Sequence, residues 1–378
     1  MKIILLIIML MVFVNLLNCS PKYPIKLTIV YSSDLEGNII PTGCGKVYYG
    51  GLPRRGTAVK RILKENPDAI VLDAGSPFYS RDMFYTWPES LIAEWNNNAE
   101  IIAKAMKITK VQAGCIGNCD LFNGFKNLKE LNKKADYPLL SLNLVDKTSQ
   151  KPYFKPYKII KHKGLKIAVI GITSPEERFK TIITVMAREK DKDMILQNLE
   201  VKRPKQLLTD LIQKLRKNKE ADFIIVLSNL GSMDDINLIN EVDGVDVLIG
   251  SGIGIEYLET VKVKNTIMCR AGGAGKFLGR IDFYLDGSNK PYGEKRKLDE
   301  LIKDIKYFKE ENKKEQLEEA EDDLKFFQDE NGKINVQFFE NNLIFLGKDM
   351  EDDPEMVNLL PEKYKGMIKD CNGFKKQD

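Results

Sequence analysis

The sequence predicts an α/β fold in which helices cover both faces of the sheets. Short apolar runs rich in Val and Ile, such as residues 68–75 and 223–228, alternate with amphipathic stretches such as residues 203–218. Strands that are apolar along their whole length are typical of sheets buried on both faces. In such folds the functional side chains gather at the carboxyl ends of the strands.

The individual elements follow from the spacing of apolar residues and from the turn residues between them. We expect helices beginning near residue 52 and over residues 89–106, 123–134, 203–218 and 233–241. We expect strands over residues 26–31, 68–73, 108–113, 138–144, 157–162, 165–173, 223–228, 245–249, 260–263, 266–270 and 277–285. The last three strands are expected to close the domain in antiparallel fashion.

The N-terminus has the pattern of an export signal. Lys2 precedes an apolar run over residues 3–17, which is short for a transmembrane helix. Leu16-Leu17-Asn18-Cys19 resembles a bacterial lipobox, with Asn18 in place of the usual small residue. We therefore expect a signal peptide over residues 1–18, a lipid on Cys19 and a tether over residues 19–25. Ordinary secretion or an uncleaved anchor remain alternatives.

This prediction places the protein in a bacterial cell envelope, facing the periplasm or the cell surface, with the membrane as its partner through the lipid. The formal charge is +4 in 378 residues, with acidic and basic residues interspersed. Nucleic-acid binding domains concentrate basic residues on one face, so no nucleic-acid partner is expected.

Two regions are expected after the tether, a domain over residues 26–287 and a charged, mainly helical extension over residues 288–378. Residues 293–330 are rich in Lys and Glu and carry an apolar stripe at heptad-like spacing, formed by Leu298, Leu301, Ile305 and Phe308. The stripe could pack on its own domain or on a partner helix. A strand from Gly332 and a last helix over residues 354–365 complete the extension.

Histidine is nearly absent, since His162 is the only one in the chain. It stands in Lys161-His162-Lys163-Gly164, where we expect an exposed hairpin turn. Imidazole is the commonest neutral metal ligand and the commonest general acid near neutral pH. Its scarcity therefore restricts the metal and acid–base chemistry open to this chain.

Several motifs stand at predicted strand ends in a fixed order. They are Ser33-Asp34-Leu35-Glu36-Gly37, Gly50-Gly51-Leu52, Leu72-Asp73-Ala74-Gly75-Ser76, Gly117-Asn118-Cys119-Asp120, Leu227-Ser228-Asn229-Leu230-Gly231 and residues 246–254. With the strand at residues 164–171, this order resembles the N-terminal domain of the 5′-nucleotidase branch of the calcineurin-like metallophosphoesterases, over about residues 26–285. The resemblance implies a sandwich of two sheets flanked by helices, with two catalytic metals at the strand ends.

Most of the metal ligands that the resemblance implies are replaced. Asp34 and Asn118 are retained, and Glu36 stands at a histidine position where it could still bind a hard metal. The other positions hold Ser76 for the bridging aspartate, Cys119 for the catalytic histidine, Asn229 for a ligand histidine, and Gly252 and Gly254 for a histidine pair. Two close divalent cations repel each other without a bridging carboxylate and enough donors.

We therefore expect a degenerate metal site in a non-catalytic binding or structural module whose protein or small-molecule ligand is unknown. No cofactor is expected, and a divalent metal could bind only at Asp34, Glu36 and Asn118. The alternative is a divergent metal-dependent phosphoesterase that uses these three residues. The resemblance also implies a C-terminal domain that stacks the nucleotide base between aromatic rings, but residues 288–378 are too few and too helical for it.

The cysteines suggest a second alternative. Cys44, Cys115 and Cys119 could face one cleft beside Asp34 and Glu36 and form a thiol-based metal or redox site, because thiolates bind soft metals. Buried structural cysteines or disulfides are the other interpretation of the same residues.

Overall fold

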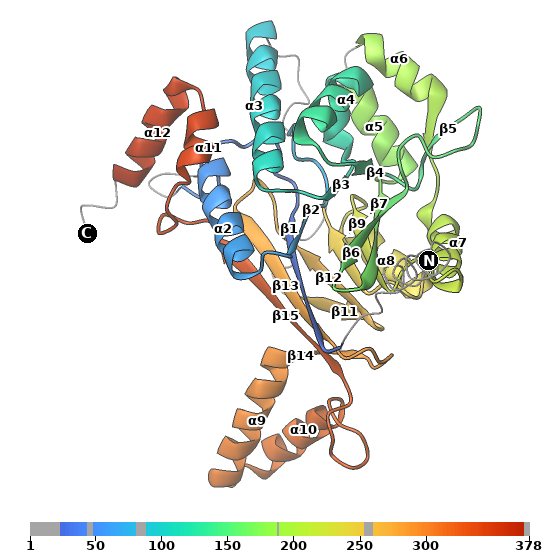
Figure 1. The fold of residues 1–378 in the computed structure, drawn as a ribbon, viewed down its shortest axis with the longest axis vertical. Helices are drawn as coiled ribbons and strands as arrows, with labels where there is room; N and C mark the ends of the chain where they lie inside the picture. Colours follow the sequence, from blue (N-terminus) through green and yellow to red (C-terminus); the bar gives the residue numbers. More distant parts are fainter. Residues whose placement is uncertain (1–22, 44–47, 81–87, 187–188, 253–259, 374–378) are drawn as a thin grey trace, which may run out of the picture.

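The computed structural model describes residues 23–43, 48–80, 88–186, 189–252 and 260–373. Two β-sheets pack face to face, and helices cover their outer faces (Figure 1). The predicted fold class is therefore confirmed. The predicted signal peptide and Cys19 lie outside the described residues, as do Cys44 and Gly254.

The first sheet has seven strands, and the four at one side, β1 to β4, run parallel to one another. Strand β13 pairs antiparallel with β1, and β15 pairs antiparallel with β13. In spatial order the strands are β14 (Tyr292–Glu294), β15 (Gln337–Phe345), β13 (Phe277–Leu285), β1 (Ile25–Ser32), β2 (Ile70–Asp73), β3 (Ala113–Cys115) and β4 (Leu139–Leu140).

The second sheet has six strands, of which the four in the middle run parallel. In spatial order they are β11 (Val261–Val263), β12 (Thr266–Arg270), β10 (Val247–Gly250), β9 (Phe223–Ser228), β7 (Leu165–Ile172) and β6 (Tyr157–His162). The expected antiparallel closure is present between β11 and β12 and between β13 and β1, although the other neighbour of β12, strand β10, runs parallel to it. A separate pair joins β5 (Leu144–Asp146) to β8 (Leu199–Val201).

The main apolar core lies between the two sheets, where side chains of alternating strand residues meet. Leu27 and Ile29 of β1 and Ile225 and Leu227 of β9 belong to this core, and each is fully or almost fully buried. The intervening residue Val226 packs instead under the helices on the outer face. Burial on both faces explains why these strands are continuous apolar runs rather than alternating ones.

The helices form the outer layers. The first sheet is covered by α2 (Leu52–Glu65), α3 (Glu89–Ile108), α4 (Gly124–Ala135) and part of α5 (Glu176–Met186) and α6 (Glu189–Asn198). The second sheet is covered by α7 (Pro204–Lys217) and α8 (Ser232–Glu241). The expected helices α2, α3, α4, α7 and α8 are present, whereas α5 and α6 were not expected from the sequence.

The C-terminal region is not a separate extension beyond residue 287. Strand β15 lies inside the first sheet, and its register pairs Phe277 with Phe345 and Tyr284 with Phe338. Helix α11 (Pro354–Leu359) packs on α2 and α3, followed by α12 (Glu362–Gly373). The expected boundary is wrong in this respect, because the pairing partner of β13 comes from residues that the sequence separates from it by the whole helical segment.

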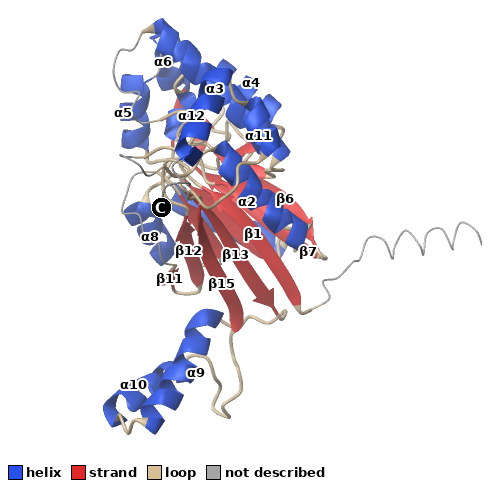
Figure 2. Cartoon of the chain, turned by 90° about the vertical axis from the view of Figure 1, so that its left-hand side faces the viewer, coloured by secondary structure: helices blue, strands red, loops and turns tan. Residues whose placement is uncertain are grey.

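The charged segment forms two helices, α9 (Lys295–Glu310) and α10 (Lys314–Lys325), which project from the end of the sandwich (Figure 2). Leu298 and Leu301 of the heptad-like stripe are buried against Ala320, Phe327 and Val336. The stripe thus packs on neighbouring parts of its own chain.

The expectation of an exposed His162 is wrong. His162 is the last residue of β6 and is only 5 % exposed, with its Nε2 3.2 Å from the backbone oxygen of Lys26. Lys26 lies at the beginning of β1, at the opposite end of that strand from Asp34. The ring therefore belongs to the sheet edge and cannot reach the strand ends where the motifs gather.

Within the described part of the chain, no helix combines the length and the apolar character needed to span a bilayer.

Candidate functional site

The strand-end motifs of both sheets meet at one edge of the sandwich. Asp34 and Ser76 follow β1 and β2, while Asn229 and Ser251 follow β9 and β10. Backbone hydrogen bonds hold the loops together, because the Asp34 amide donates to the Gly75 oxygen and the Ser251 amide donates to the Ser228 oxygen. The sequence correctly predicted that these motifs converge, since parallel strands bring their carboxyl ends to a common edge.

The turns in this region have unusual backbone geometry. Asp34, Glu36 and Ser76 have φ angles of 47°, 54° and 55°, in the left-handed region that non-glycine residues rarely adopt. Ser76 also packs against Gly117 so closely that a Cβ on Gly117 would lie 2.1 Å from the Ser76 Oγ. Strained turns with such close contacts are concentrated at functional sites and are held by the structure around them.

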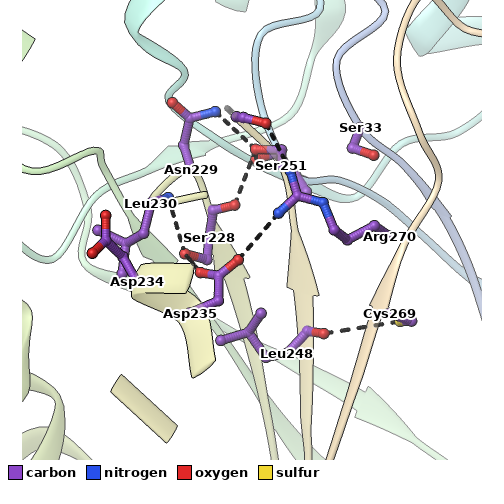
Figure 3. A network of polar contacts seen from close by, with 12 residues as sticks. Ser33, Ser228, Asn229, Leu230, Asp234, Asp235, Leu248, Ser251, Cys269 and Arg270 are labelled. Carbon is purple, nitrogen blue, oxygen red and sulfur yellow. Dashed lines mark hydrogen bonds and ion pairs between the residues drawn. The ribbon is translucent and has the colours of Figure 1, made fainter. Parts of the chain in front are cut away.

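Asn229 lies at the centre of a hydrogen-bond network that joins the two sheets. Its Nδ2 donates to Ser251 Oγ at 2.8 Å and to Ser76 Oγ at 3.4 Å. Ser251 Oγ in turn donates to the backbone oxygen of Ala74 at 2.6 Å. Figure 3 shows the Asn229 side chain directed toward Ser251. Asn229, Ser251 and Ser76 are all buried, so these bonds form away from water, where they are strongest.

Asp34 directs its carboxylate to the backbone of the loop after β10. Its two oxygens accept a hydrogen bond from the Gly252 amide at 3.1 and 2.9 Å, and Asp34 is 5 % exposed. Gly252 has a φ of 80°, and a Cβ there would lie 2.9 Å from the Asn229 backbone oxygen. Glycine thus allows the loop to approach Asp34 closely, which a side chain at this position would prevent.

The other two predicted metal ligands are placed differently. Glu36 is half-buried, and its amide donates to the Ser76 oxygen at 2.9 Å. It lines a cavity of about 540 Å³ beside the network. Asn118 begins the short 3₁₀ helix η2 (Asn118–Leu121), and its side chain lies outside the described part of the structure.

The predicted thiol cluster is divided between two cores. Cys115 packs between the sheets, and its Sγ donates to the Ile172 oxygen at 3.2 Å. Cys119 belongs to the core under the helices of the first sheet and is 2 % exposed. Burial raises the pKa of the Cys115 thiol well above its usual value and that of Cys269 to about 12. Buried, protonated thiols are poor nucleophiles and poor metal ligands.

A buried ion pair below the network was not expected from the sequence. Arg270, at the end of β12, donates from Nη1 to Asp235 Oδ2 at 3.3 Å and from Nη2 to the Gly252 oxygen at 2.7 Å. Ser228 Oγ donates to Asp235 Oδ1 at 2.5 Å (Figure 3). Asp235 and Arg270 are 0 % and 4 % exposed. Two features of the sequence could have indicated this ion pair: a single arginine at the end of an apolar strand, and acidic residues in the first turn of α8.

The burial of this pair has an electrostatic consequence. Loss of hydration raises the pKa of Asp235 to about 7, although the Ser228 hydroxyl and the Arg270 guanidinium favour its charged form. The pair also occupies the space beside β10, because a Cβ on Gly250 would lie 2.7 Å from Asp235 Oδ2 and 3.0 Å from Arg270 Nη1.

Asp120 is a second buried acid that the sequence did not single out. Its carboxylate accepts hydrogen bonds from the amides of Ser76, Phe78 and Gly117 at 3.1, 3.2 and 2.9 Å. It therefore joins the loop after β2 to the loop after β3. Burial raises the pKa of Asp120 to about 8 despite these three donors.

Among the described residues, no three His, Cys, Asp or Glu side chains are grouped so that they could hold a metal ion. The polar groups at this edge are instead hydrogen-bonded to one another. The Asn229 amide donates to the hydroxyls of Ser251 and Ser76. The Asp34 carboxylate accepts from the Gly252 backbone amide, and the Arg270 guanidinium donates to the Asp235 carboxylate. These hydrogen bonds join the loops of the first sheet to those of the second and can hold the two sheets together at this edge.

Comparisons with known proteins agree with this fold. No family model matches the chain. It is 27 % identical over 239 residues to the protein UshA of Yersinia enterocolitica and 28 % identical over 236 residues to a snake venom 5′-nucleotidase of Naja atra. These matches cover 62 % and 60 % of this chain but only 39 % and 40 % of the relatives. The chain therefore matches about two fifths of the length of these relatives.

Two solved structures are similar over most of the chain. A 5′-nucleotidase precursor from Thermus thermophilus aligns with a TM-score of 0.60 and 18 % identity, covering 92 % of this chain and 59 % of the other. The calcineurin-like phosphoesterase YfkN from Bacillus subtilis aligns with a TM-score of 0.59 and 18 % identity, covering 92 % of this chain and 99 % of the other. The fold is that of a metallophosphoesterase. Within that class the resemblance to the 5′-nucleotidase branch is confirmed for about 60 % of the chain.

Proposed function

We propose that this protein is an envelope lipoprotein whose 5′-nucleotidase-like domain no longer hydrolyses phosphate esters and serves as a binding or structural module. The observation that carries the proposal is the Asn229–Ser251–Ser76 network. Asn229 and Ser76 stand at positions where the family pattern calls for metal ligands, and here they are hydrogen-bonded to each other, with Ser251 as the second partner of Asn229. At a third such position, Gly252 donates its backbone amide to Asp34.

The donor set supports this proposal. A two-metal phosphoesterase holds both cations about 3.5–4 Å apart, which requires a bridging carboxylate and several anionic or imidazole ligands. Ser76 offers a neutral hydroxyl in place of the bridge, and Gly252 offers no side chain. Asp34 retains its carboxylate, but both oxygens already accept the Gly252 amide. These residues do not fit a dinuclear centre.

The membrane part of the proposal depends on the sequence alone. Cys19 would carry the lipid and place the domain at the surface of a bacterial membrane, facing the periplasm or the cell exterior. Globomycin treatment of producing cells, which blocks lipoprotein signal cleavage, should cause a larger precursor to accumulate. A processed chain that is water-soluble and carries no lipid by mass spectrometry would contradict this part.

Hydrolysis assays test the catalytic part. Purified protein should hydrolyse neither AMP, a cyclic nucleotide nor p-nitrophenyl phosphate with Mn²⁺, Zn²⁺, Co²⁺ or Mg²⁺. Turnover that is lost in both Asp34→Ala and Asn118→Ala, and retained in a variant at an exposed residue such as Glu130→Gln, would instead support a divergent phosphoesterase.

That divergent phosphoesterase is the second candidate function, and the similarity to proteins named 5′-nucleotidase favours it. The thiol-based site is less well supported, because Cys115 and Cys119 lie in different cores and burial raises the Cys115 pKa.

A further inference from the structure

A cavity of about 700 Å³ opens at the end of the sandwich where β7 and β9 begin, opposite to the strand ends that carry the motifs. Its other walls come from the end of α7, from the loop over residues 287–290 and from Tyr23. A volume of this size lies in the range of small-molecule sites in proteins. The cavity is therefore large enough for a ligand and is separate from the Asn229–Ser251–Ser76 network.

Hydrogen bonds among the wall residues hold this cavity in shape. The Asp246 carboxylate accepts from the Arg216 guanidinium at 2.8 Å and from the Tyr292 hydroxyl at 2.8 Å. Gln337, which is 6 % exposed, donates from Nε2 to the Ser288 oxygen at 3.1 Å. These bonds join α7, β14, β15 and the loop before β14. A preformed wall reduces the ordering cost of binding.

Two oppositely charged side chains on one wall have no ion-pair partner. Lys219 and Asp222 both line the cavity, and neither forms an ion pair with another residue in the described part of the chain. Two other cations of the walls are paired, because Arg216 binds Asp246 at 2.8 Å and Lys290 binds a neighbouring aspartate at 3.2 Å. The unpaired ammonium group and the unpaired carboxylate are available to a ligand.

The positive and negative groups occupy different parts of the wall. The Lys166 amide donates to Asp222 Oδ2 at 2.8 Å, whereas the Lys166 ammonium group extends to the Lys219 backbone oxygen at 2.9 Å. Lys166 thus adds a second positive charge on the Lys219 side. Partial burial and the carboxylates of Asp222 and Asp286 raise the pKa of the Tyr23 hydroxyl. Negative charge therefore lies beside the Tyr23 ring.

This division of charge identifies a class of ligand. Phosphate oxygens accept charge-assisted hydrogen bonds from lysine ammonium groups, and a ligand ammonium group is attracted by a carboxylate and by the face of a tyrosine ring. A ligand with only negative charge would be repelled by Asp222, and one with only positive charge by the two lysines. The ligand that matches both parts carries one group of each sign.

The position of the cavity indicates where such a ligand comes from. Tyr23 lies four residues after Cys19, so its Cα is within about 14 Å of the residue expected to carry the lipid. The cavity would then open close to the membrane surface, where phospholipid head groups are concentrated. This step rests on the proposed lipid anchor, whereas the charges of the walls do not.

We propose that this cavity binds a zwitterionic phosphodiester with an ammonium group, as in the head group of phosphatidylethanolamine. The phosphate binds the ammonium groups of Lys166 and Lys219, and the ligand ammonium group binds Asp222 beside the Tyr23 ring.

Three soluble probes test the charge requirement on the full processed chain: glycerophosphoethanolamine, glycerophosphoglycerol and ethanolamine. Calorimetry should show saturable binding of glycerophosphoethanolamine, with a dissociation constant on the order of 1 mM for so small a molecule. The two probes that carry a single charge should bind about tenfold more weakly or worse. Failure of glycerophosphoethanolamine to saturate, or equal binding of either single-charge probe, would overturn the proposal.

Matched variants assign the binding to this wall. Lys219→Gln and Asp222→Asn each remove one charge and should weaken glycerophosphoethanolamine binding by about fivefold or more. Asp222→Asn should also abolish the preference over glycerophosphoglycerol, which a folding defect would not do selectively. Lys217→Gln and Asp210→Asn change exposed residues of α7 outside the cavity and should bind as the natural chain does. Equal effects of test and control variants would refute the assignment.

A lipid probe tests the membrane source. Dihexanoyl phosphatidylethanolamine, kept below its critical micelle concentration, should bind at least as tightly as glycerophosphoethanolamine. Binding about tenfold weaker would show that the cavity excludes acyl chains and would overturn the membrane source. The anchor is tested separately by its lipid: a chain without lipid that still binds the soluble probes would contradict the anchor alone, and a lipidated chain that binds none of them would contradict the cavity proposal alone.

Discussion

Replacing Arg270 by methionine should strongly destabilise the protein, because it leaves the Asp235 carboxylate buried without its cation. Methionine keeps much of the apolar volume of the arginine stem, so the change is mainly electrostatic. Arg270 makes two described hydrogen bonds through its guanidinium, to Asp235 at 3.3 Å and to the Gly252 oxygen at 2.7 Å. The substitution therefore also releases the loop that carries the Asp34 contact.

The magnitude follows from burial. Asp235 is 0 % exposed and Arg270 4 %, so neither group can regain water without local unfolding. Removing one partner of such a buried pair costs about 3–5 kcal/mol of unfolding free energy, since the other charge stays in a low dielectric. The cost should be smaller at lower pH, because Asp235 already has a raised pKa of about 7 and can escape the penalty by taking up a proton.

The assay is urea unfolding monitored by circular dichroism at about pH 8 and about pH 5.5, on either side of the Asp235 pKa. Arg296→Met is the matched control, because Arg296 is 67 % exposed and pairs with Glu294 at the surface at 3.2 Å. Its loss should cost no more than about 1 kcal/mol at either pH.

A double-mutant cycle tests the same reasoning. Adding Asp235→Asn to Arg270→Met removes both charges, so the double variant should be at least about 1 kcal/mol more stable than the sum of the single effects predicts. A loss below about 1 kcal/mol for Arg270→Met at about pH 8, or additive effects in the cycle, would show that the pair does not stabilise the strand ends as argued.

Three further outcomes are expected. Ellman's reagent should leave Cys115 and Cys269 unmodified in the folded protein and label them after denaturation, because both are buried and burial raises both thiol pKa values. Unfolding free energy should fall as pH rises from about 4 to about 8, because folded Asp120 keeps its proton up to about pH 8 whereas the unfolded chain releases it near 3.8. Ending the chain at residue 336 should abolish folding, because it removes β15 from the sheet, whereas ending it at residue 373 should not.

A different result would contradict each of these three predictions. Rapid labelling of Cys115 in the folded protein, detected by peptide mass spectrometry, would support the thiol-based site. A pH slope that persists unchanged in Asp120→Asn would assign the proton to another group. A chain ending at residue 336 that stays soluble and unfolds cooperatively would restore the expected boundary after residue 287.

Local patterns predicted much of the fold. The amphipathic spacing in residues 203–218 gave α7 almost to the residue, and the Lys163-Gly164 turn gave the β6–β7 hairpin. Helices α5 and α6 were missed because charges interrupt their apolar spacing. The insertion of β15 between β14 and β13 could not be predicted, because strand order depends on contacts between distant residues.

The site was predicted at the level of positions but not of contacts. The order of the motifs correctly predicted that Asp34, Ser76, Asn229 and Gly252 lie at one edge of the sandwich. The sequence did not indicate that these residues would hydrogen-bond to one another, nor that Arg270 would be buried beneath them. Such pairings depend on close approach in space, and a lone arginine after an apolar strand is more often at the surface.

Metal analysis of the purified full chain tests the central claim most directly. The protein is exposed to equimolar Zn²⁺ and Mn²⁺, and free metal is then removed. Elemental analysis by inductively coupled plasma mass spectrometry should find well under one metal ion per chain. Chelators should leave the unfolding transition unchanged. Two tightly held ions per chain, lost on chelation together with stability and lost in Asp34→Ala, would contradict the account and restore a working metal centre at the strand ends.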